Sequence, residues 1–403
     1  MKIMNLCSIR AVSVLCAMFM LLSIGISVNA DSTAPEPTLI KENASVKTSL
    51  SLDCRSCILM EASTGTVLYE SNADEALRPA SVAKIMTILL VMEAVKSGAI
   101  TMNDTVSVSE NAASMGGSQV YLEPGEAMTV RELLKCVVIA SANDASVALA
   151  EYIAGSEDAF VARMNERASE LSMENTNFVN TNGLDDAEDS SAHLTSARDI
   201  AIMSRELIVN HPEIFEFTTV WMDTIRNGEF GLTNTNRLIR FYRGATGLKT
   251  GSTSKAGFCI SATAERDNMS LIAVIMGAPT RDVRNEAAKA LLDYGYANYC
   301  VYSDPAAKCE NVPVKGAVCA SVKSAHGDFT AVLKKGMDKN VTSTVTLSQD
   351  LSAPVSVGDA VGSVTYFADG EIIGEIPVTA TENAEKIGYF GVIYKIFRGI
   401  LSK

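Results

Sequence analysis

The chain has 403 residues, of which 47% are hydrophobic and 20% are charged, and its formal net charge at pH 7 is −13. This length suggests two or three domains with ordinary globular cores. Because the chain is acidic and shows neither a Gly-rich phosphate loop nor a basic-aromatic tract, we expect no nucleic-acid partner.

The N-terminal segment predicts export. Lys2 and Arg10 precede the apolar stretch AVSVLCAMFMLLSIGISV, and VNA at 28–30 fits a small-x-small cleavage pattern. We therefore expect a signal peptide over 1–30 and a polar linker over 31–50, with an uncleaved membrane anchor as the alternative to cleavage. In either case the rest of the chain is expected at the extracytoplasmic face of the cytoplasmic membrane.

The cysteines and histidines form no recognisable metal motif. Cys54 and Cys57 make a C-x-x-C, but no second pair follows at zinc spacing, and the three histidines are scattered. Cys57 begins an apolar run, so we expect it to be a buried thiol. We expect neither a metal nor an organic cofactor.

The first predicted elements are a β-hairpin and a cluster of helices. The segment 56–74 has two β-rich runs around the turn STG. RPAS then leads into VAKIMTILLVMEAVKSG, a helix that is apolar nearly all round and ends at Gly98. TVRE at 129–132 fits a capping box, and helical signals continue to about residue 171 with a break at SANDAS (141–146).

Strands return at 245–278, where two adjacent antiparallel segments precede a helix over 286–299. Helices flanked by strands from both ends of the segment indicate an α+β domain over 51–300, with one antiparallel sheet and a helical cluster. From 301 to 382, short alternating runs between turn residues predict a small all-β domain.

The C-terminal segment AEKIGYFGVIYKIFRGILSK (384–403) is basic in an acidic chain. At 100° per residue, its apolar side chains share one broad face. The pattern predicts an amphipathic helix over 383–403 that lies on a membrane surface. A helix packed on the protein's own body is the alternative.

The stretch PASVAKIMT contains a serine and a lysine three positions apart. On a helix, Ser81 and Lys84 lie on one face. A lysine whose pKa is lowered by burial can take the serine proton, and the helix N-terminus offers N–H groups to an oxyanion. The pattern S-x-x-K is common by itself, and Ser252 with Lys255 repeats it. The alternative is that Ser81 caps the helix and Lys84 extends outward to solvent.

Two further motifs favour catalysis. Ser141-Ala142-Asn143 interrupts a helical region with a hydroxyl and an amide, and Lys249-Thr250-Gly251 begins a predicted strand in which Gly251 lets a ligand approach the backbone. S-x-x-K, S-x-N and K-T-G in this order are typical of penicillin-binding proteins and class A β-lactamases.

With RPASVAKIMT, NTNGLDD, HLTSARD and GLKTGSTSKAGF, the chain resembles the low-molecular-mass penicillin-binding proteins that act as serine D-alanyl-D-alanine carboxypeptidases, over nearly everything after residue 50. The resemblance implies a penicillin-binding or β-lactamase-like transpeptidase fold, a β-rich domain and a C-terminal helix. It implies that Ser81 is acylated with Lys84 as base. Peptidoglycan stem peptides would be the substrate, and β-lactams would be covalent inhibitors.

The resemblance also assigns the remaining site residues. Ser141 would relay a proton to the leaving group, and Asn143 would contact the substrate amide. Lys249 and Thr250 would face the substrate's terminal carboxylate. The backbone N–H groups of Ser81 and Ser252 would form the oxyanion hole. In this family an arginine at the exit of the next strand often completes the carboxylate pocket; Arg284 matches it, with a surface arginine as the alternative.

Two other functions stay open. A class A-like β-lactamase is one, although no E-x-x-L-N-type loop lies between 144 and 248. The other is a catalytically inactive peptidoglycan-binding protein. Covalent labelling by penicillin separates that second alternative from the enzyme.

Overall fold

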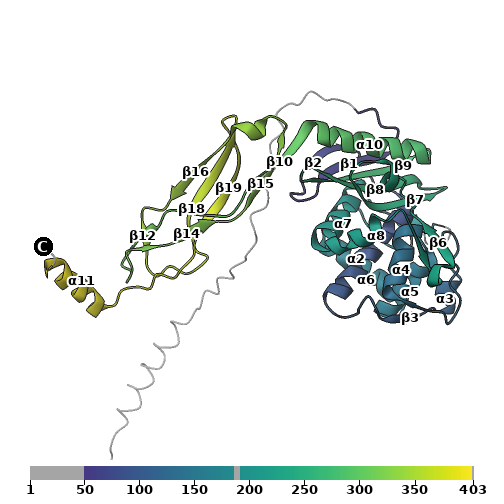
Figure 1. Cartoon of the computed structure of the whole chain (residues 1–403), viewed down its shortest axis with the longest axis horizontal. Helices are drawn as coiled ribbons and strands as arrows, with labels where there is room; N and C mark the ends of the chain where they lie inside the picture. Colours follow the sequence, from purple (N-terminus) through teal and green to yellow (C-terminus); the bar gives the residue numbers. More distant parts are fainter. Residues whose placement is uncertain (1–49, 186–190, 402–403) are drawn as a thin grey trace, which may run out of the picture. The chain divides into compact units, whose positions relative to one another are not determined.

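The computed structural model describes residues 50–185 and 191–401. The predicted signal peptide and nearly all of the predicted linker lie outside these residues. The first part of the described chain is built on a five-stranded antiparallel sheet (Figure 1), in the order β2-β1-β9-β8-β7. Its strands are β1 (Ser56–Glu61), β2 (Val67–Ser71), β7 (Ala245–Thr253), β8 (Gly257–Arg266) and β9 (Met269–Ala278).

Helices cover both faces of this sheet. In β1, Ile58 and Met60 belong to a core with α2 (Lys84–Lys96) and α7 (Ala197–Asn210), whereas Cys57 and Leu59 belong to a second core with α10 (Arg281–Asn298). This alternation is the two-residue period of a strand buried on both sides. Figure 1 shows α10 on one side of the sheet and α2 and α7 on the other. The predicted α+β architecture is confirmed.

The longer helices of this part are α2 (Lys84–Lys96), α5 (Asn143–Ala154), α6 (Glu157–Glu170), α7 (Ala197–Asn210) and α10 (Arg281–Asn298). Shorter elements connect them: η1 (Ala80–Ala83), β3 (Thr105–Ser107), α3 (Glu110–Ala113), β4 (Ala127–Thr129), α4 (Val130–Lys135), η2 (Cys136–Ala140), η4 (Pro212–Ile214), α8 (Phe215–Thr218), β5 (Met222–Ile225), η5 (Arg226–Gly228), β6 (Phe230–Thr233) and α9 (Leu238–Phe241).

Two helix starts show what local sequence determines. Thr129 and Glu132 form the predicted capping box, with each side chain bonded to the other's backbone N–H. By contrast, α10 begins at Arg281, five residues before the expected start, because the Thr280 hydroxyl accepts a bond from the Val283 N–H and caps the helix there. Arg284 therefore lies in the first turn of α10 and not in the loop that leaves β9.

The later part of the chain is all-β, with one short 3-10 turn, and has its own core, which includes Val312, Val364 and Val378. A five-stranded sheet has the order β11-β14-β19-β18-β16, and two smaller sheets have the orders β13-β12-β17 and β10-β15. The elements are β10 (Tyr299–Asp304), β11 (Ala307–Lys308), β12 (Val312–Lys315), β13 (Ser321–Val322), β14 (Ser324–His326), β15 (Phe329–Lys334), η6 (Met337–Asn340), β16 (Val341–Leu347), β17 (Leu351–Ser352), β18 (Ala360–Ala368) and β19 (Glu371–Ala380).

The C-terminal helix α11 (Tyr389–Leu401) is shorter than predicted. Residues 384–388 are not helical, because Ala384 pairs with Val355 and Lys386 pairs with Ala317 in single β-bridges. The expected start at 383 is therefore wrong, since tertiary pairing holds this stretch extended. Within 50–185 and 191–401, the structure has no helix that is both long and apolar enough to cross a membrane.

Candidate active site

Ser81 lies in the 3-10 turn η1, directly before α2. Its side chain caps no helix, since Pro79 and Ala83 occupy the two N-cap positions. The Nζ atom of Lys84 lies 3.1 Å from the Ser81 hydroxyl oxygen, and the Lys84 side chain is fully buried. Both parts of the alternative interpretation, a capping serine and a solvent-facing lysine, are therefore wrong.

Lys84 is held by three acceptors. Besides Ser81, its Nζ donates to the Asn143 side-chain oxygen and to the Asn182 backbone carbonyl, both at 2.6 Å. Burial, and secondly the positive charge of Lys249, lower the pKa of Lys84 well below its ordinary value. A neutral Lys84 amine has a lone pair with which it can accept the Ser81 proton.

The Ser141-Ala142-Asn143 segment forms a break between two helical stretches. A π-helical turn over 136–140 ends at Ser141, whose φ of 63° lies in the left-handed region, and α5 begins at Asn143. The Asn143 Nδ2 donates to the Gly116 carbonyl at 2.7 Å, and its backbone N–H donates to Ser118 O at 2.7 Å. The break therefore directs the Ser141 and Asn143 side chains at the two lysines.

Strand β7 supplies the third motif. The Lys249 side chain is buried, and its Nζ donates to the Ser141 hydroxyl at 2.8 Å. Thr250 donates through its hydroxyl to the hydroxyl of Thr235, also at 2.8 Å. Ser252, two residues beyond Thr250, is exposed. Burial, and secondly the charge of Arg284, lower the pKa of Lys249 to about 7.

Gly251 is required by close packing of β7 on η1. A Cβ atom at this position would lie 2.7 Å from the Ser81 backbone nitrogen and 2.9 Å from that of Val82. Only glycine permits this approach, which brings the Ser81 N–H next to the strand. The three motifs, far apart in sequence, therefore meet around Ser81.

Arg284 is buried in the first turn of α10, so the alternative of a surface arginine is wrong. Its guanidinium donates from Nε and Nη2 to the Asn285 side-chain oxygen, and from Nη1 to the Cys259 carbonyl on β8 at 3.4 Å. These bonds use three of its five N–H groups. Its positive charge is the second cause, after burial, of the lowered pKa of Lys249.

Sequence reasoning did not single out Asn182, Gly183 or Thr235. Asn182 contributes only a backbone carbonyl, which no side-chain pattern announces. At Gly183, which has a φ of +85°, a Cβ atom would lie 1.9 Å from the Ala80 carbonyl oxygen. The segment around Gly183 therefore has to pack against η1, and this glycine was the available signal.

A serine hydroxyl in contact with a fully buried lysine amine, with a second buried lysine on β7, is an arrangement typical of serine acyl-transfer enzymes. Over residues 42–280 the chain matches the family described as D-alanyl-D-alanine carboxypeptidase, and over 312–386 it matches the penicillin-binding protein 5 C-terminal domain. The chain belongs to this family, and the resemblance inferred from its motifs is confirmed.

Individual relatives agree with this family assignment. The D-alanyl-D-alanine carboxypeptidase DacF of Bacillus subtilis is 43% identical over 87% of this chain and 90% of its own length. Penicillin-binding protein 5 of Haemophilus influenzae is 31% identical, with a TM-score of 0.76 over 84% of this chain and 99% of that structure. Penicillin-binding protein D2 of Listeria monocytogenes, solved in its ampicillin-bound form, is 31% identical, with a TM-score of 0.56 over 62% of this chain and 99% of that structure.

Proposed function

We propose that this chain is a serine-type D-alanyl-D-alanine carboxypeptidase that removes the terminal D-alanine from peptidoglycan stem peptides through an acyl-enzyme on Ser81. The observation that carries this function is the Ser81–Lys84 pair, in which a hydroxyl contacts a fully buried amine. Family membership supports the same activity and not the two alternatives, a β-lactamase or an inactive binding protein.

In the proposed acylation step, Ser81 Oγ attacks the carbonyl carbon between the two D-alanines while neutral Lys84 accepts its proton. The tetrahedral oxyanion would receive hydrogen bonds from the backbone N–H groups of Ser81 and Ser252. The packing of Gly251 on the Ser81 nitrogen supports this geometry, because Ser252 is the next residue on β7.

Collapse of that intermediate breaks the C–N bond. The departing amine needs a proton. We propose that it receives, through the Ser141 hydroxyl, the proton that Lys84 took from Ser81, which leaves Lys84 neutral for the next step; the bond between Ser141 and Lys249 supports this role for Ser141. Water then hydrolyses the Ser81 ester with Lys84 as base, which releases the shortened peptide and restores the serine. We propose that Asn143 binds the substrate amide through its side chain.

The leaving D-alanine carries a free carboxylate. We propose that Lys249, Thr250 and Arg284 bind it, since cations and hydroxyls form strong hydrogen bonds to carboxylates. Buried cations are costly without a partner, Lys249 and Arg284 are both buried, and the charge of Arg284 lowers the pKa of Lys249. An anionic substrate group would supply that partner.

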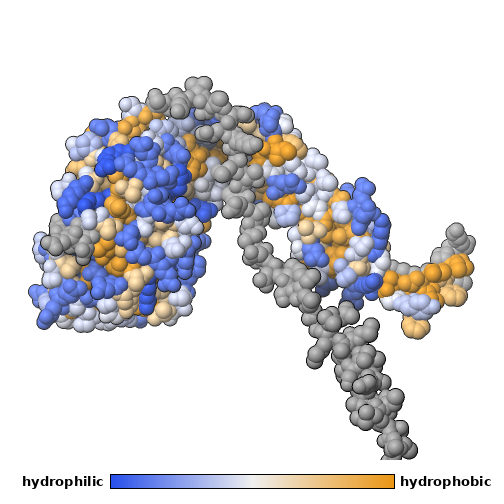
Figure 2. All heavy atoms as spheres, turned by 180° about the vertical axis from the view of Figure 1, so that it is seen from behind, coloured by the Kyte–Doolittle hydropathy of each residue, from blue (hydrophilic) through white to orange (hydrophobic). Residues whose placement is uncertain are grey.

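We also propose a division of the chain into a catalytic domain over 51–300, a β-rich domain over 301–382 and a C-terminal membrane-association segment. Separate hydrophobic cores support the first two. The apolar side chains of α11 support the third, because Tyr389 is 77% and Phe390 84% exposed to solvent. Figure 2 shows the hydrophobic residues gathered along this helix.

The direct test incubates the purified protein with a stem pentapeptide and measures released D-alanine. We expect the pentapeptide to be converted to the tetrapeptide over many turnovers, with one D-alanine released for each pentapeptide. Release of no D-alanine by protein that still labels with penicillin would reject the carboxypeptidase function. Rapid turnover of penicillin instead would favour the β-lactamase alternative.

A further inference from the structure

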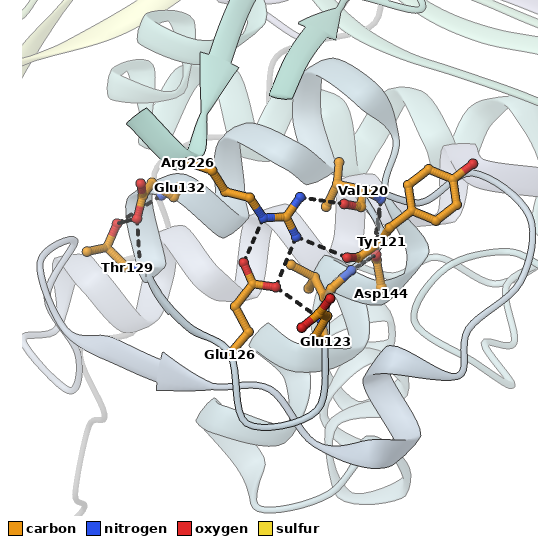
Figure 3. Close-up of polar contacts among 9 residues, drawn as sticks. Val120, Tyr121, Glu123, Glu126, Thr129, Glu132, Asp144 and Arg226 are labelled. Carbon is orange, nitrogen blue, oxygen red and sulfur yellow. Dashed lines mark hydrogen bonds and ion pairs between the residues drawn. The ribbon is translucent and has the colours of Figure 1, made fainter. Parts of the chain in front are cut away.

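An arginine outside the three motifs holds the loop next to Asn143. Arg226 follows β5, and its guanidinium binds both carboxylate oxygens of Glu126, at 2.8 and 2.9 Å. It also donates to the backbone carbonyls of Val120 at 2.9 Å and Tyr121 at 3.0 Å. Figure 3 shows the four bonds radiating from one guanidinium. Arg226 thus connects the β5–β6 hairpin with two points of the loop 116–126.

The opposite side of this loop is bound to α5. Asp144, which is fully buried, accepts the backbone N–H groups of Val120 at 3.0 Å and Leu122 at 3.1 Å. The preceding residue, Asn143, binds Ser118 O and Gly116 O in the same loop. The loop is therefore fixed between Arg226 and the helix that starts at the S-x-N motif.

The bonds from Arg226 and Asp144 hold the backbone of Tyr121 and of its two neighbours, Val120 and Leu122. Its φ of 57° and the φ of 51° at Arg226 are left-handed values that residues other than glycine rarely adopt. Such conformations persist only where the surroundings enforce them, and they cluster at functional sites. Yet the Tyr121 side chain is 66% exposed and has an edge contact with the Phe230 ring. In Figure 3 its phenol points away from the arginine. Core packing does not explain this constraint.

Tyr121 belongs to the loop that Asn143 binds. It follows Ser118, which binds Asn143, by three residues, so the chain separates the two by at most roughly 11 Å. Asn143 in turn contacts Lys84, which contacts Ser81. A pentapeptide bound at Ser81 has three residues on the N-terminal side of the two D-alanines, and three extended residues span at most roughly 11 Å.

We propose that Tyr121 contacts the stem-peptide residues that precede the two D-alanines, and that Arg226 is a positioning residue that holds Tyr121 in place. This inference rests on the proposed function and deepens it. The exposed aromatic ring offers an apolar face to the peptide at low entropic cost, because its backbone is already fixed.

The test compares two substrates of different length, the stem pentapeptide and an N-acetylated D-Ala-D-Ala dipeptide. For Tyr121→Ala we expect KM for the pentapeptide to rise roughly three- to ten-fold, the range of one lost aromatic contact. The dipeptide, which is too short to reach Tyr121, should show a change of less than about two-fold by the same reasoning. Arg226→Ala should reproduce this selective effect. In Arg226→Lys the KM for the pentapeptide should return only in part to that of the unmodified protein, because lysine cannot form the paired bonds to Glu126.

Tyr152→Ala provides the matched control, since Tyr152 is an exposed tyrosine on α5 whose hydroxyl donates a hydrogen bond to Asp104. Its kinetics should be unchanged on both substrates. An equal rise in KM for the two substrates in Tyr121→Ala, or no rise for the pentapeptide, would overturn the proposal. Thermal unfolding of each variant identifies a general loss of folding. If the unmodified protein releases D-alanine from neither substrate, the proposed function itself fails instead.

Discussion

The Nζ atom of Lys249 lies 2.8 Å from the Ser141 hydroxyl oxygen, although 108 positions separate these residues in the chain. Two residues beyond Ser141, Asn143 accepts a bond from Lys84. One three-residue segment therefore contacts both buried lysines. Each lysine lies where a charge is costly, and the positive charge of Lys249 further lowers the pKa of Lys84. The segment thus connects the proposed base to the proposed carboxylate site.

The nucleophile can be tested by covalent labelling. Ser81→Ala should abolish labelling by a fluorescent penicillin, because the same oxygen would open the β-lactam ring. Ser252→Ala is the control, since Ser252 begins the second S-x-x-K and its exposed side chain is not part of the proposed chemistry. It should label as the unmodified protein does. Label that persists in Ser81→Ala would rule out the proposed mechanism.

Gly251 tests the packing between β7 and η1. In Gly251→Ala, the new Cβ would lie 2.7 Å from the Ser81 nitrogen, so the strand or the turn has to move. A misplacement of about 1 Å can cost roughly 100-fold in rate, and we expect a loss of that order in penicillin acylation. Gly231→Ala on β6 meets no atom within 4 Å and should acylate normally. Equal rates in the two variants would contradict this geometry.

Arg284 tests carboxylate recognition. Arg284→Ala should reduce turnover of the stem pentapeptide by roughly 10- to 100-fold, which corresponds to a lost charge-assisted hydrogen bond of about 1.5–3 kcal/mol. Hydrolysis of a thioester substrate without the terminal carboxylate should fall much less. Arg281→Ala, an exposed arginine in the same helical turn, serves as the control. Similar losses on both substrates would show that Arg284 does not act on the carboxylate.

The pH dependence follows from the pKa of Lys249, which burial and Arg284 lower to about 7. Lys249 is protonated below this pH and loses its charge above it. For a substrate with a free carboxylate, kcat/KM should therefore fall as pH rises through about 7. Arg284→Met removes a like charge, which raises the pKa of Lys249 and should move this fall to higher pH. A fall that stays in place or moves to lower pH would refute the coupling of the two groups.

The first two motifs could be found from the sequence because they lie at breaks between elements, where local patterns are informative, and the third because its glycine stands out within a predicted strand. Ser81 precedes a helix that is apolar nearly all round, Ser141 follows a capping-box helix, and Gly251 lies in a strand that approaches another backbone. The burial of Arg284 could not be predicted in the same way, because it depends on where α10 begins. The start of α11 depends on bridges from Ala384 and Lys386 to distant segments, while the apolar periodicity runs on across them.

The last prediction concerns membrane association through the C-terminal helix. It is tested on protein that begins after residue 30 and so lacks the predicted signal peptide. Because Ala384 and Lys386 pair with the β-rich part, the chain should be truncated after Gly388, not after 382. We expect the truncated protein to keep its carboxypeptidase activity but to lose cosedimentation with vesicles of phosphatidylglycerol and phosphatidylcholine. Its removed segment has exposed Phe390 and Phe397 and is basic in an acidic chain, which suits an anionic interface. Full-length Phe390→Glu should also bind more weakly, since it places a charge on the apolar surface while the fold stays complete. If the truncated protein still sediments with the vesicles, or if the full-length protein never does, α11 is not the membrane-association segment.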